Sequence, residues 1–284
     1  MPDVKSTDRI SQKSLLAFFL LAYAITWGLS VLATKDLLPF SIPPLVMNLS
    51  AILLHYGPAI AAIMMAAIGD GRSGVFALLG RLGRWRVGLR WYLFIFLFPL
   101  LVRLAAVGID TLLGGKLPSF FNSAQVPAGN PVLVLPVVFL AVLFQAGLAE
   151  EIGWRGFGLP GLQQRFDALT ASLILGVVWT AWHFHPQNFT VLWPIAFWYF
   201  FSIIPTTILF TWIYNNTGES LLMAVLFHTV GNVCDWIVPT LPAVANATSI
   251  RPFIIESIWV WVTAIIVIAI YGPKKLSRKI PAQA

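Results

Sequence analysis

Residues 131–151, PVLVLPVVFLAVLFQAGLAEE, form an apolar run that ends on two adjacent glutamates. The run carries no charged residue before Glu150. A helix needs about 20 consecutive apolar residues to cross the hydrocarbon core of a bilayer. Similar runs recur along the chain, so the sequence predicts a membrane protein whose spans are helices.

The composition of the whole chain supports this fold class. Of its 284 residues, 58% are hydrophobic and 10% are charged, whereas a soluble domain carries about a quarter charged residues. Disorder is excluded by the many large apolar side chains, and a β-barrel by the long unbroken apolar runs. We therefore expect an all-α, polytopic transmembrane helical bundle.

The apolar runs predict about eight spans. They lie near residues 14–34, 45–69, 89–109, 131–151, 169–184, 191–214, 219–236 and 253–272. The sequence contains no internal repeat and no long linker, so residues 1–284 are expected to form a single integral membrane domain.

The basic residues predict the orientation of the chain. They gather between the second and third runs and after the last one, at Arg72, Arg81, Arg84, Arg86, Arg90, Lys274, Lys275, Arg278 and Lys279. Cytoplasmic loops are enriched in Lys and Arg, and an even number of spans puts both termini on one side. We expect a multi-pass protein of the cell membrane with both termini cytoplasmic. The net charge of +7 then reflects orientation and not nucleic acid binding.

Ionisable residues at membrane depth are the candidates for chemistry, because a charge at the bilayer centre costs at least about 2.5–3.5 kcal/mol. Glu151 and Arg155 are four residues apart on a helix and suit an ion pair. Glu150 projects about 100° away from Glu151, so the two carboxylates should point to different places. Glu150 is then free to act as a base. Alternatively, both glutamates lie solvated at the cytoplasmic interface.

Two further groups lie in later runs. Trp179 and His183 share a helix face, whereas His185 is about 200° further round and should point away. His228 and Asn232 also project side by side, and Gly231 beside them would let a neighbouring helix or a substrate backbone come close. Alternatively, His183 belongs to an aromatic belt at the membrane interface, and His228 and Asn232 join helices through hydrogen bonds.

Together these side chains suit hydrolysis of a buried peptide bond. A carboxylate can take a proton from water, an imidazole can position that water, and an amide with a second imidazole can stabilise an oxyanion. No serine or cysteine lies in a recognisable nucleophile setting. Activated water is therefore the expected nucleophile.

The three motifs, in this order on a multi-span chain, resemble the CAAX protease and bacteriocin-processing family, which includes the type II CAAX prenyl endopeptidases. They are Glu150-Glu151-x-x-x-Arg155, an aromatic residue four positions before His183, and His228-x-x-x-Asn232. The resemblance covers about residues 130–235. Trp179 departs from it, because the family more often has Phe there, and the expected effect is on packing.

The resemblance implies an eight-helix intramembrane protease whose site opens to the cytoplasmic leaflet. It assigns Glu150 and His183 to the water-activating pair, His228 and Asn232 to oxyanion stabilisation, and Glu151 with Arg155 to support. The implied partner is a polypeptide or membrane-protein substrate within the lipid bilayer, with or without a lipid group. No cofactor is expected.

Two other hypotheses remain open at this point. The first is a zinc protease with His183, His228 and one carboxylate as ligands, although the chain has no H-E-x-x-H pair. The second is a non-enzymatic membrane scaffold, immunity factor or carrier in which the polar cluster is structural or relays protons.

Overall fold

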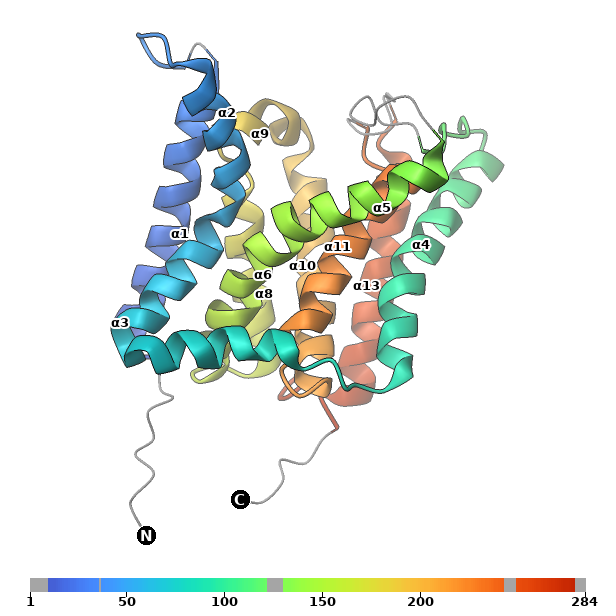
Figure 1. Cartoon of the computed structure of the whole chain (residues 1–284). Helices are drawn as coiled ribbons and strands as arrows, with labels where there is room; N and C mark the ends of the chain where they lie inside the picture. Colours follow the sequence, from blue (N-terminus) through green and yellow to red (C-terminus); the bar gives the residue numbers. More distant parts are fainter. Residues whose placement is uncertain (1–9, 36, 122–129, 243–248, 279–284) are drawn as a thin grey trace.

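The computed structural model describes residues 10–35, 37–121, 130–242 and 249–278, and every regular element in these ranges is a helix (Figure 1). The helices in chain order are α1 (Gln12–Ala33), α2 (Pro44–Leu53), η1 (Leu54–Tyr56), α3 (Gly57–Gly80), η2 (Arg81–Gly83), α4 (Leu89–Leu112), α5 (Pro131–Val142), η3 (Leu143–Leu148), α6 (Ala149–Gly153), η4 (Trp154–Gly158), α7 (Leu159–Gln163), α8 (Ala168–Trp182), α9 (Pro186–Leu192), η5 (Trp193–Ile195), α10 (Ala196–Asn216), α11 (Leu221–Ile237) and α13 (Arg251–Tyr271).

The predicted all-α bundle of about eight spans is confirmed. Six helical stretches are long and apolar enough to cross a membrane, and α8 and α11 are two shorter apolar helices. The chain is a multi-pass membrane protein. Helix α1 begins and α13 ends at the same end of the bundle, as an even number of crossings requires (Figure 1).

The second predicted span is less regular than expected. It is interrupted by the 3-10 turn η1, after which α3 begins at Gly57, where an added Cβ would lie 2.1 Å from Thr26 Oγ1 of α1. Helix α3 then bends at Gly71, whose φ is +60°, and its second half runs along one end of the bundle (Figure 1). The arginine-rich stretch between the second and third apolar runs therefore continues as helix to Gly80, and the 3-10 turn η2 follows it.

The fourth predicted span is also not a uniform helix. The five residues of α6 lie between two π-helical segments, η3 and η4. π-Helical turns widen a helix locally and occur frequently at functional sites. Glu150 and Glu151 both lie in α6.

Two glycines let this segment approach its neighbours. A Cβ on Gly147 would lie 2.4 Å from Thr229 Oγ1 of α11, and a Cβ on Gly153 would lie 2.4–2.6 Å from atoms of Pro58 in α3. A larger residue at either position would force the helices apart. The close contacts fix α6 between α3 and α11.

The short helices α8 and α11 have well-defined starts. Asp167 caps α8 by accepting the backbone N–H of Thr170, and Ser220 caps α11 by accepting the N–H of Met223. Two hydrogen bonds from Thr170 to the carboxylate of the exposed Asp167 lower the pKa of this group. Helix α8 packs on α10, and α11 packs on α4, η3 and α6. Near its end, α8 reaches α6 through the hydrogen bond from Trp179 to Glu150.

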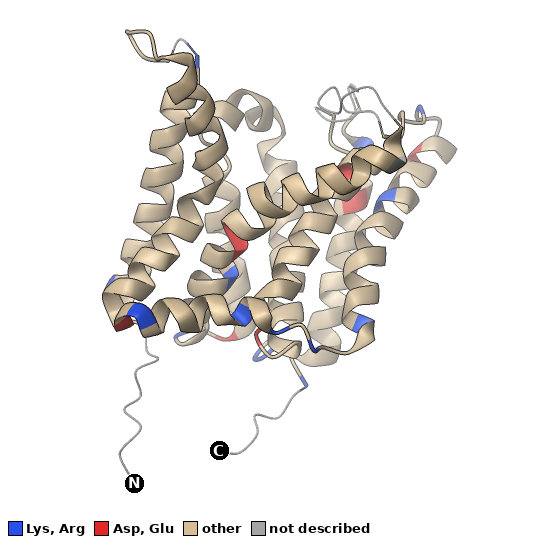
Figure 2. Ribbon diagram, viewed as in Figure 1, with Lys and Arg blue, Asp and Glu red and all other residues tan. Residues whose placement is uncertain are grey.

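Basic residues are concentrated at the end of the bundle where α1 begins and α13 ends (Figure 2). We call this the basic end. The described residues there include Lys13, Arg72, Arg81, Arg84, Arg86, Arg90, Arg165, Lys274, Lys275 and Arg278. The opposite end, called the far end, carries Lys35, Lys116 and Arg251.

Candidate active site

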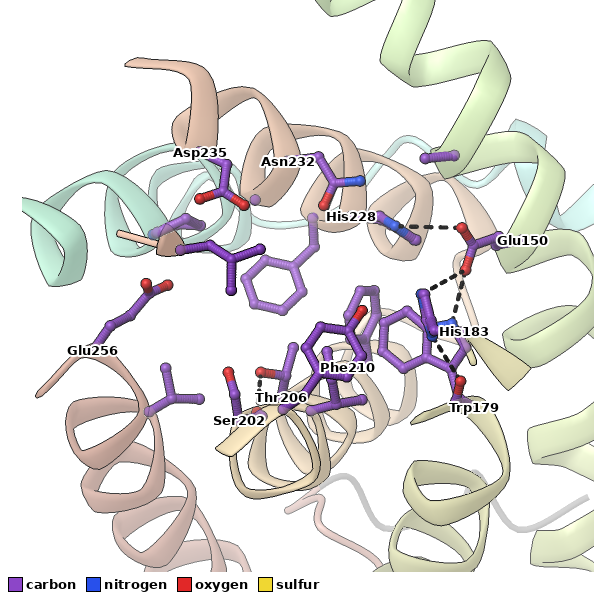
Figure 3. A pocket seen from close by; sticks show the side chains of 18 of the residues that line it. Glu150, Trp179, His183, Ser202, Thr206, Phe210, His228, Asn232, Asp235 and Glu256 are labelled. Atoms are coloured by element: carbon purple, nitrogen blue, oxygen red, sulfur yellow. Dashed lines mark hydrogen bonds and ion pairs between the residues drawn. The ribbon is translucent and has the colours of Figure 1, made fainter. Parts of the chain in front are cut away.

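A cavity of about 320 Å³ lies inside the bundle and receives side chains from α4, α6, α8, α10, α11 and α13. All four predicted site residues line it, namely Glu150, His183, His228 and Asn232 (Figure 3). Residues that are far apart in the sequence are thus brought to one hollow by three different helical segments. We take this cavity as the candidate active site.

Glu150 is the residue on which the other groups converge. Its side chain is nearly fully buried, and Oε2 accepts a 2.7 Å hydrogen bond from the indole Nε1 of Trp179. His183 Nε2 lies 4.0 Å from Oε2, and His228 Nε2 lies 4.0 Å from Oε1. Each carboxylate oxygen therefore faces the free nitrogen of one imidazole (Figure 3).

The ring of His183 is held by the backbone of its own helix. Nδ1 donates a 2.7 Å hydrogen bond to the carbonyl oxygen of Trp179, one turn earlier. A carbonyl can only accept, so Nδ1 carries the proton and Nε2 is left facing Glu150. The indole and imidazole rings are also in contact, with centroids 5.6 Å apart and planes inclined by 56°.

The ring of His228 is held by a carboxylate. Nδ1 donates to Glu151 Oε1 at 2.8 Å, and the same oxygen accepts a 2.9 Å hydrogen bond from Arg155. The predicted pair of Glu151 and Arg155 is therefore present. The prediction that the two glutamates point to different places was incomplete, because both face the imidazole of His228. Glu151 lies at Nδ1 of this ring and Glu150 at Nε2.

Neither glutamate lies exposed at an interface, since Glu151 is fully buried and Glu150 is 4% exposed. Arg155 is also fully buried. Its guanidinium carbon lies 4.3 Å from the ring centre of Trp179 and 3.8 Å from that of Phe210. Stacking between two aromatic rings stabilises a cation away from water.

Asn232 lies one turn after His228 on α11 and lines the same cavity. Its side chain is exposed to this space and forms no hydrogen bond within the described part of the chain. Gly231 does not serve helix packing, because an added Cβ would meet no atom within 4 Å. Gly231 was expected to let either a neighbouring helix or a substrate backbone come close. The open space beside it leaves room for a substrate backbone.

Trp179 does more than pack, contrary to expectation. Its indole N–H binds the carboxylate that is the candidate base, and a phenylalanine at this position would have no such donor.

His185 was expected to point away from His183. The two rings have different partners, because His183 faces Glu150 of α6 whereas His185 faces Ser30 of α1. His185 lines the cavity, and its Nδ1 lies 2.9 Å from the hydroxyl of Ser30. His55 of η1, which sequence analysis did not single out, lines the cavity as well.

A second group of charges in the cavity was also missed. Arg103 of α4 pairs with Asp235 of α11 and with Glu256 of α13, the latter at 3.2 Å. In Figure 3 these two carboxylates lie across the cavity from Glu150. All three residues lie in predicted spans, so the criterion of ionisable groups at membrane depth would have found them.

Among the described residues, no group of three or more His, Cys, Asp and Glu side chains is placed to hold a metal ion. The chain has one cysteine, Cys234, which is buried outside the cavity lining.

Residues 132–234 match the protein family described as Type II CAAX prenyl endopeptidase Rce1-like. The predicted family resemblance is confirmed over this segment. It contains Glu150, His183, His228 and Asn232, which are the residues that the structure brings together.

One curated relative extends the comparison. The CAAX prenyl protease 2 of Methanococcus maripaludis is 31% identical over 149 residues. The aligned part is 49% of this chain and 53% of the relative, so the chain spans about half the length of the curated protein that it matches.

Proposed function

We propose that this protein is an intramembrane endopeptidase that hydrolyses a peptide bond with water activated by Glu150. The observation that carries the proposal is the position of the Nε2 atoms of His183 and His228, each 4.0 Å from a different oxygen of Glu150. A separation of 4.0 Å is too long for a direct hydrogen bond and suits a bridging water.

In the proposed first step, the water lies between Glu150 and His183. It donates one hydrogen to the carboxylate and the other to His183 Nε2, which is an acceptor because Nδ1 holds the proton of that ring. Glu150 then takes a proton as the water oxygen attacks the carbonyl carbon of the substrate. The product of this step is a tetrahedral oxyanion.

The proposed oxyanion donors are His228 and Asn232. Because His228 Nδ1 already donates to Glu151, donation from Nε2 requires the ring to be an imidazolium. With both glutamates ionised, Arg155 and this imidazolium bring the formal charge of the four side chains to zero. Charge neutrality favours this state in a water-poor interior.

The C–N bond breaks in the second step. Glu150 returns its proton to the leaving nitrogen, and the carbonyl re-forms as the oxyanion collapses. The products are a new carboxyl terminus and a new amino terminus. Glu150 is again a carboxylate, so the cycle needs no further reactant.

We propose that this reaction does not use a metal. Support comes from the side-chain geometry, because among the described residues no three His, Cys, Asp or Glu side chains are placed together to hold an ion. Metal analysis of the purified protein tests this point together with chelator treatment. Stoichiometric zinc, with loss of cleavage after chelation and recovery on zinc addition, would favour the zinc protease hypothesis instead.

The proposed substrate is a polypeptide or a segment of a membrane protein. The name of the relative from M. maripaludis supports a prenylated tail as one form of it. Aromatic and aliphatic side chains of the cavity wall, such as Phe98, Ile203 and Phe227, suit an apolar residue or a lipid group near the scissile bond. We further propose that both termini lie in the cytoplasm, as the charge bias indicates.

Glu150→Gln tests the proposal, because glutamine keeps the shape and an acceptor for Trp179 but cannot take a proton from water. Membrane proteomes of cells with the wild-type chain and with Glu150→Gln are compared for peptides with new termini. We expect these peptides to disappear in the variant at unchanged protein yield. Glu219→Gln, at an exposed glutamate of the basic end, is the matched control and should behave as wild type.

Persistence of the same termini in Glu150→Gln would overturn the proposed base. The non-enzymatic hypothesis is favoured by two results together. Peptide termini are the same in cells with the wild-type chain and with Glu150→Gln, and a cellular phenotype of the protein survives both Glu150→Gln and His228→Ala.

A further inference from the structure

A small pocket lies at the basic end of the bundle, outside the candidate active site. Its volume is about 260 Å³, and it lies between the residues that lead into α4 and the end of α10. We call it the arginine pocket, and its lining consists of Arg86, Val87, Gly88, Arg90, Trp91, Asn216 and Thr217. It shares no lining residue with the cavity that holds Glu150.

The charge of the arginine pocket is not balanced. Arg86 and Arg90 line it, and no carboxylate does. Among the described residues neither of these arginines forms an ion pair, whereas their neighbour Arg84 lies 3.6 Å from Glu219. Two positive charges on one pocket wall repel each other. An anion bound between them would remove this repulsion.

Aromatic rings hold the two guanidinium groups. The guanidinium carbon of Arg86 lies 5.2 Å from the ring centre of Trp85, and that of Arg90 lies 5.3 Å from the ring centre of Trp91. Trp91 is itself buried and packs edge-on against Trp212. Stacking uses the face of a guanidinium and leaves the N–H donors at its edge free for an anion.

The loop that leads into α4 is fixed by hydrogen bonds to its neighbours. Ser220 Oγ donates to the carbonyl oxygen of Arg84 at 2.6 Å, and the hydroxyl of Tyr92 donates to the carbonyl oxygen of Trp85 at 2.7 Å. The backbone N–H of Val87 donates to the same carbonyl oxygen. Binding of a ligand therefore has to order little of the loop, which favours affinity.

The arginine pocket lies at the level of the lipid headgroups. Helix α4 is long and apolar enough to cross a membrane, and the pocket is built around its first residues. Trp85 next to the pocket is exposed, and tryptophan is enriched at the boundary between membrane and water. The phosphate of a phospholipid is the anion that lies at this depth.

A file of exposed leucines continues from Arg90 along α4. Leu93, Leu97, Leu101 and Leu104 follow Arg90 by 3, 7, 11 and 14 positions, which is the spacing of one helix face, and all four are exposed. The acyl chain of a lipid can lie along this file while its phosphate is in the pocket. A free anion from the water would make no contact with these leucines.

From these observations we propose that the arginine pocket binds the phosphate of an anionic phospholipid. Arginine suits this ligand, because a guanidinium can donate two parallel hydrogen bonds to phosphate oxygens. A zwitterionic headgroup fits less well, since the pocket offers no carboxylate to its ammonium group. The proposal is independent of the proposed hydrolysis.

Lipid binding to the purified full chain in detergent tests the proposal, with phosphatidylglycerol and phosphatidylcholine as probes. Native mass spectrometry counts the lipids bound to each protein molecule. We expect the wild type to bind its first phosphatidylglycerol about tenfold more tightly than phosphatidylcholine. Arg86→Gln/Arg90→Gln should lose this preference, because both guanidinium groups of the pocket are removed.

Arg72→Gln/Lys274→Gln is the matched control. It removes the same net charge from exposed side chains of the same end, and neither residue lines the arginine pocket. This variant should keep the wild-type preference. An equal loss in both double variants would show that only the overall charge attracts the lipid and would overturn the proposal, as would a wild type without any preference.

Inorganic phosphate distinguishes a lipid from a free anion. Added at the same concentration as the lipid, it should not displace phosphatidylglycerol from the wild type. Displacement would identify free phosphate as the ligand and overturn the assignment to a lipid.

The thermal unfolding midpoint without lipid shows whether each variant is folded. If Arg86→Gln/Arg90→Gln is not, the single variants Arg86→Gln and Arg90→Gln replace it, and each should lose part of the preference for phosphatidylglycerol. A full wild-type preference in both single variants would overturn the proposal.

Discussion

At the scale of single residues, Trp179 links the two halves of the proposed water-activating pair. Its backbone carbonyl fixes the proton of His183 on Nδ1, and its indole N–H binds Oε2 of Glu150. One residue thereby sets the orientation of the base and the tautomer of its neighbour. We regard Trp179 as a positioning residue.

Trp179→Phe should lower kcat about tenfold, because a hydrogen bond to a charged group contributes about 1.5–3 kcal/mol and part of it orients the carboxylate. KM should change little, since the indole N–H is used by Glu150. Steady-state kinetics on a peptide cleaved by the wild type would measure both. An unchanged kcat would show that the indole only packs.

Trp212→Phe is the matched control for this experiment. The indole N–H of Trp212 is buried without a hydrogen-bond partner among the described residues, and it lies in a different aromatic group with Trp91 and Phe94. The same chemical change there should leave kcat near the wild-type value.

At the scale of elements, the close packing of α6 against α3 holds Glu150 in place. Gly153 makes this possible, because its Cα faces the backbone of Pro58 with no room for a Cβ. The sequence indicates the apolar run of residues 131–151, the two glutamates at its end and the helical spacing of Glu151 and Arg155. It does not indicate that two π-helical segments flank α6, because their widened turns follow from packing against other helices.

Gly153→Ala should destabilise the protein by about 1–3 kcal/mol, since the new methyl group forces two helices apart. The thermal unfolding midpoint in detergent measures this effect. Gly28→Ala on α1 is the control, because an added Cβ there meets no atom within 4 Å. Equal midpoints for both variants would contradict the proposed packing.

At the scale of the whole molecule, the sequence predicts far more of the fold than of the site. Hydropathy locates the spans and the Lys and Arg residues separate the two ends. The three motifs identify Glu150, His183 and His228, because ionisable residues are rare at membrane depth. The sequence could not indicate that the charges of Arg103 and its partners share the cavity with Glu150, since that depends on which helix faces meet.

The proposed hydrolysis depends most on Glu150 and His183 acting on the same water. The most direct test is a cycle of Glu150→Gln, His183→Asn and the double variant, assayed as purified protein on one peptide substrate. Asparagine can keep the donor to the Trp179 carbonyl while it removes Nε2. If the two residues act as a unit, each single variant loses nearly all activity and the double variant is no worse than either. Losses that multiply in the double variant, or activity retained by Glu150→Gln, would contradict the account.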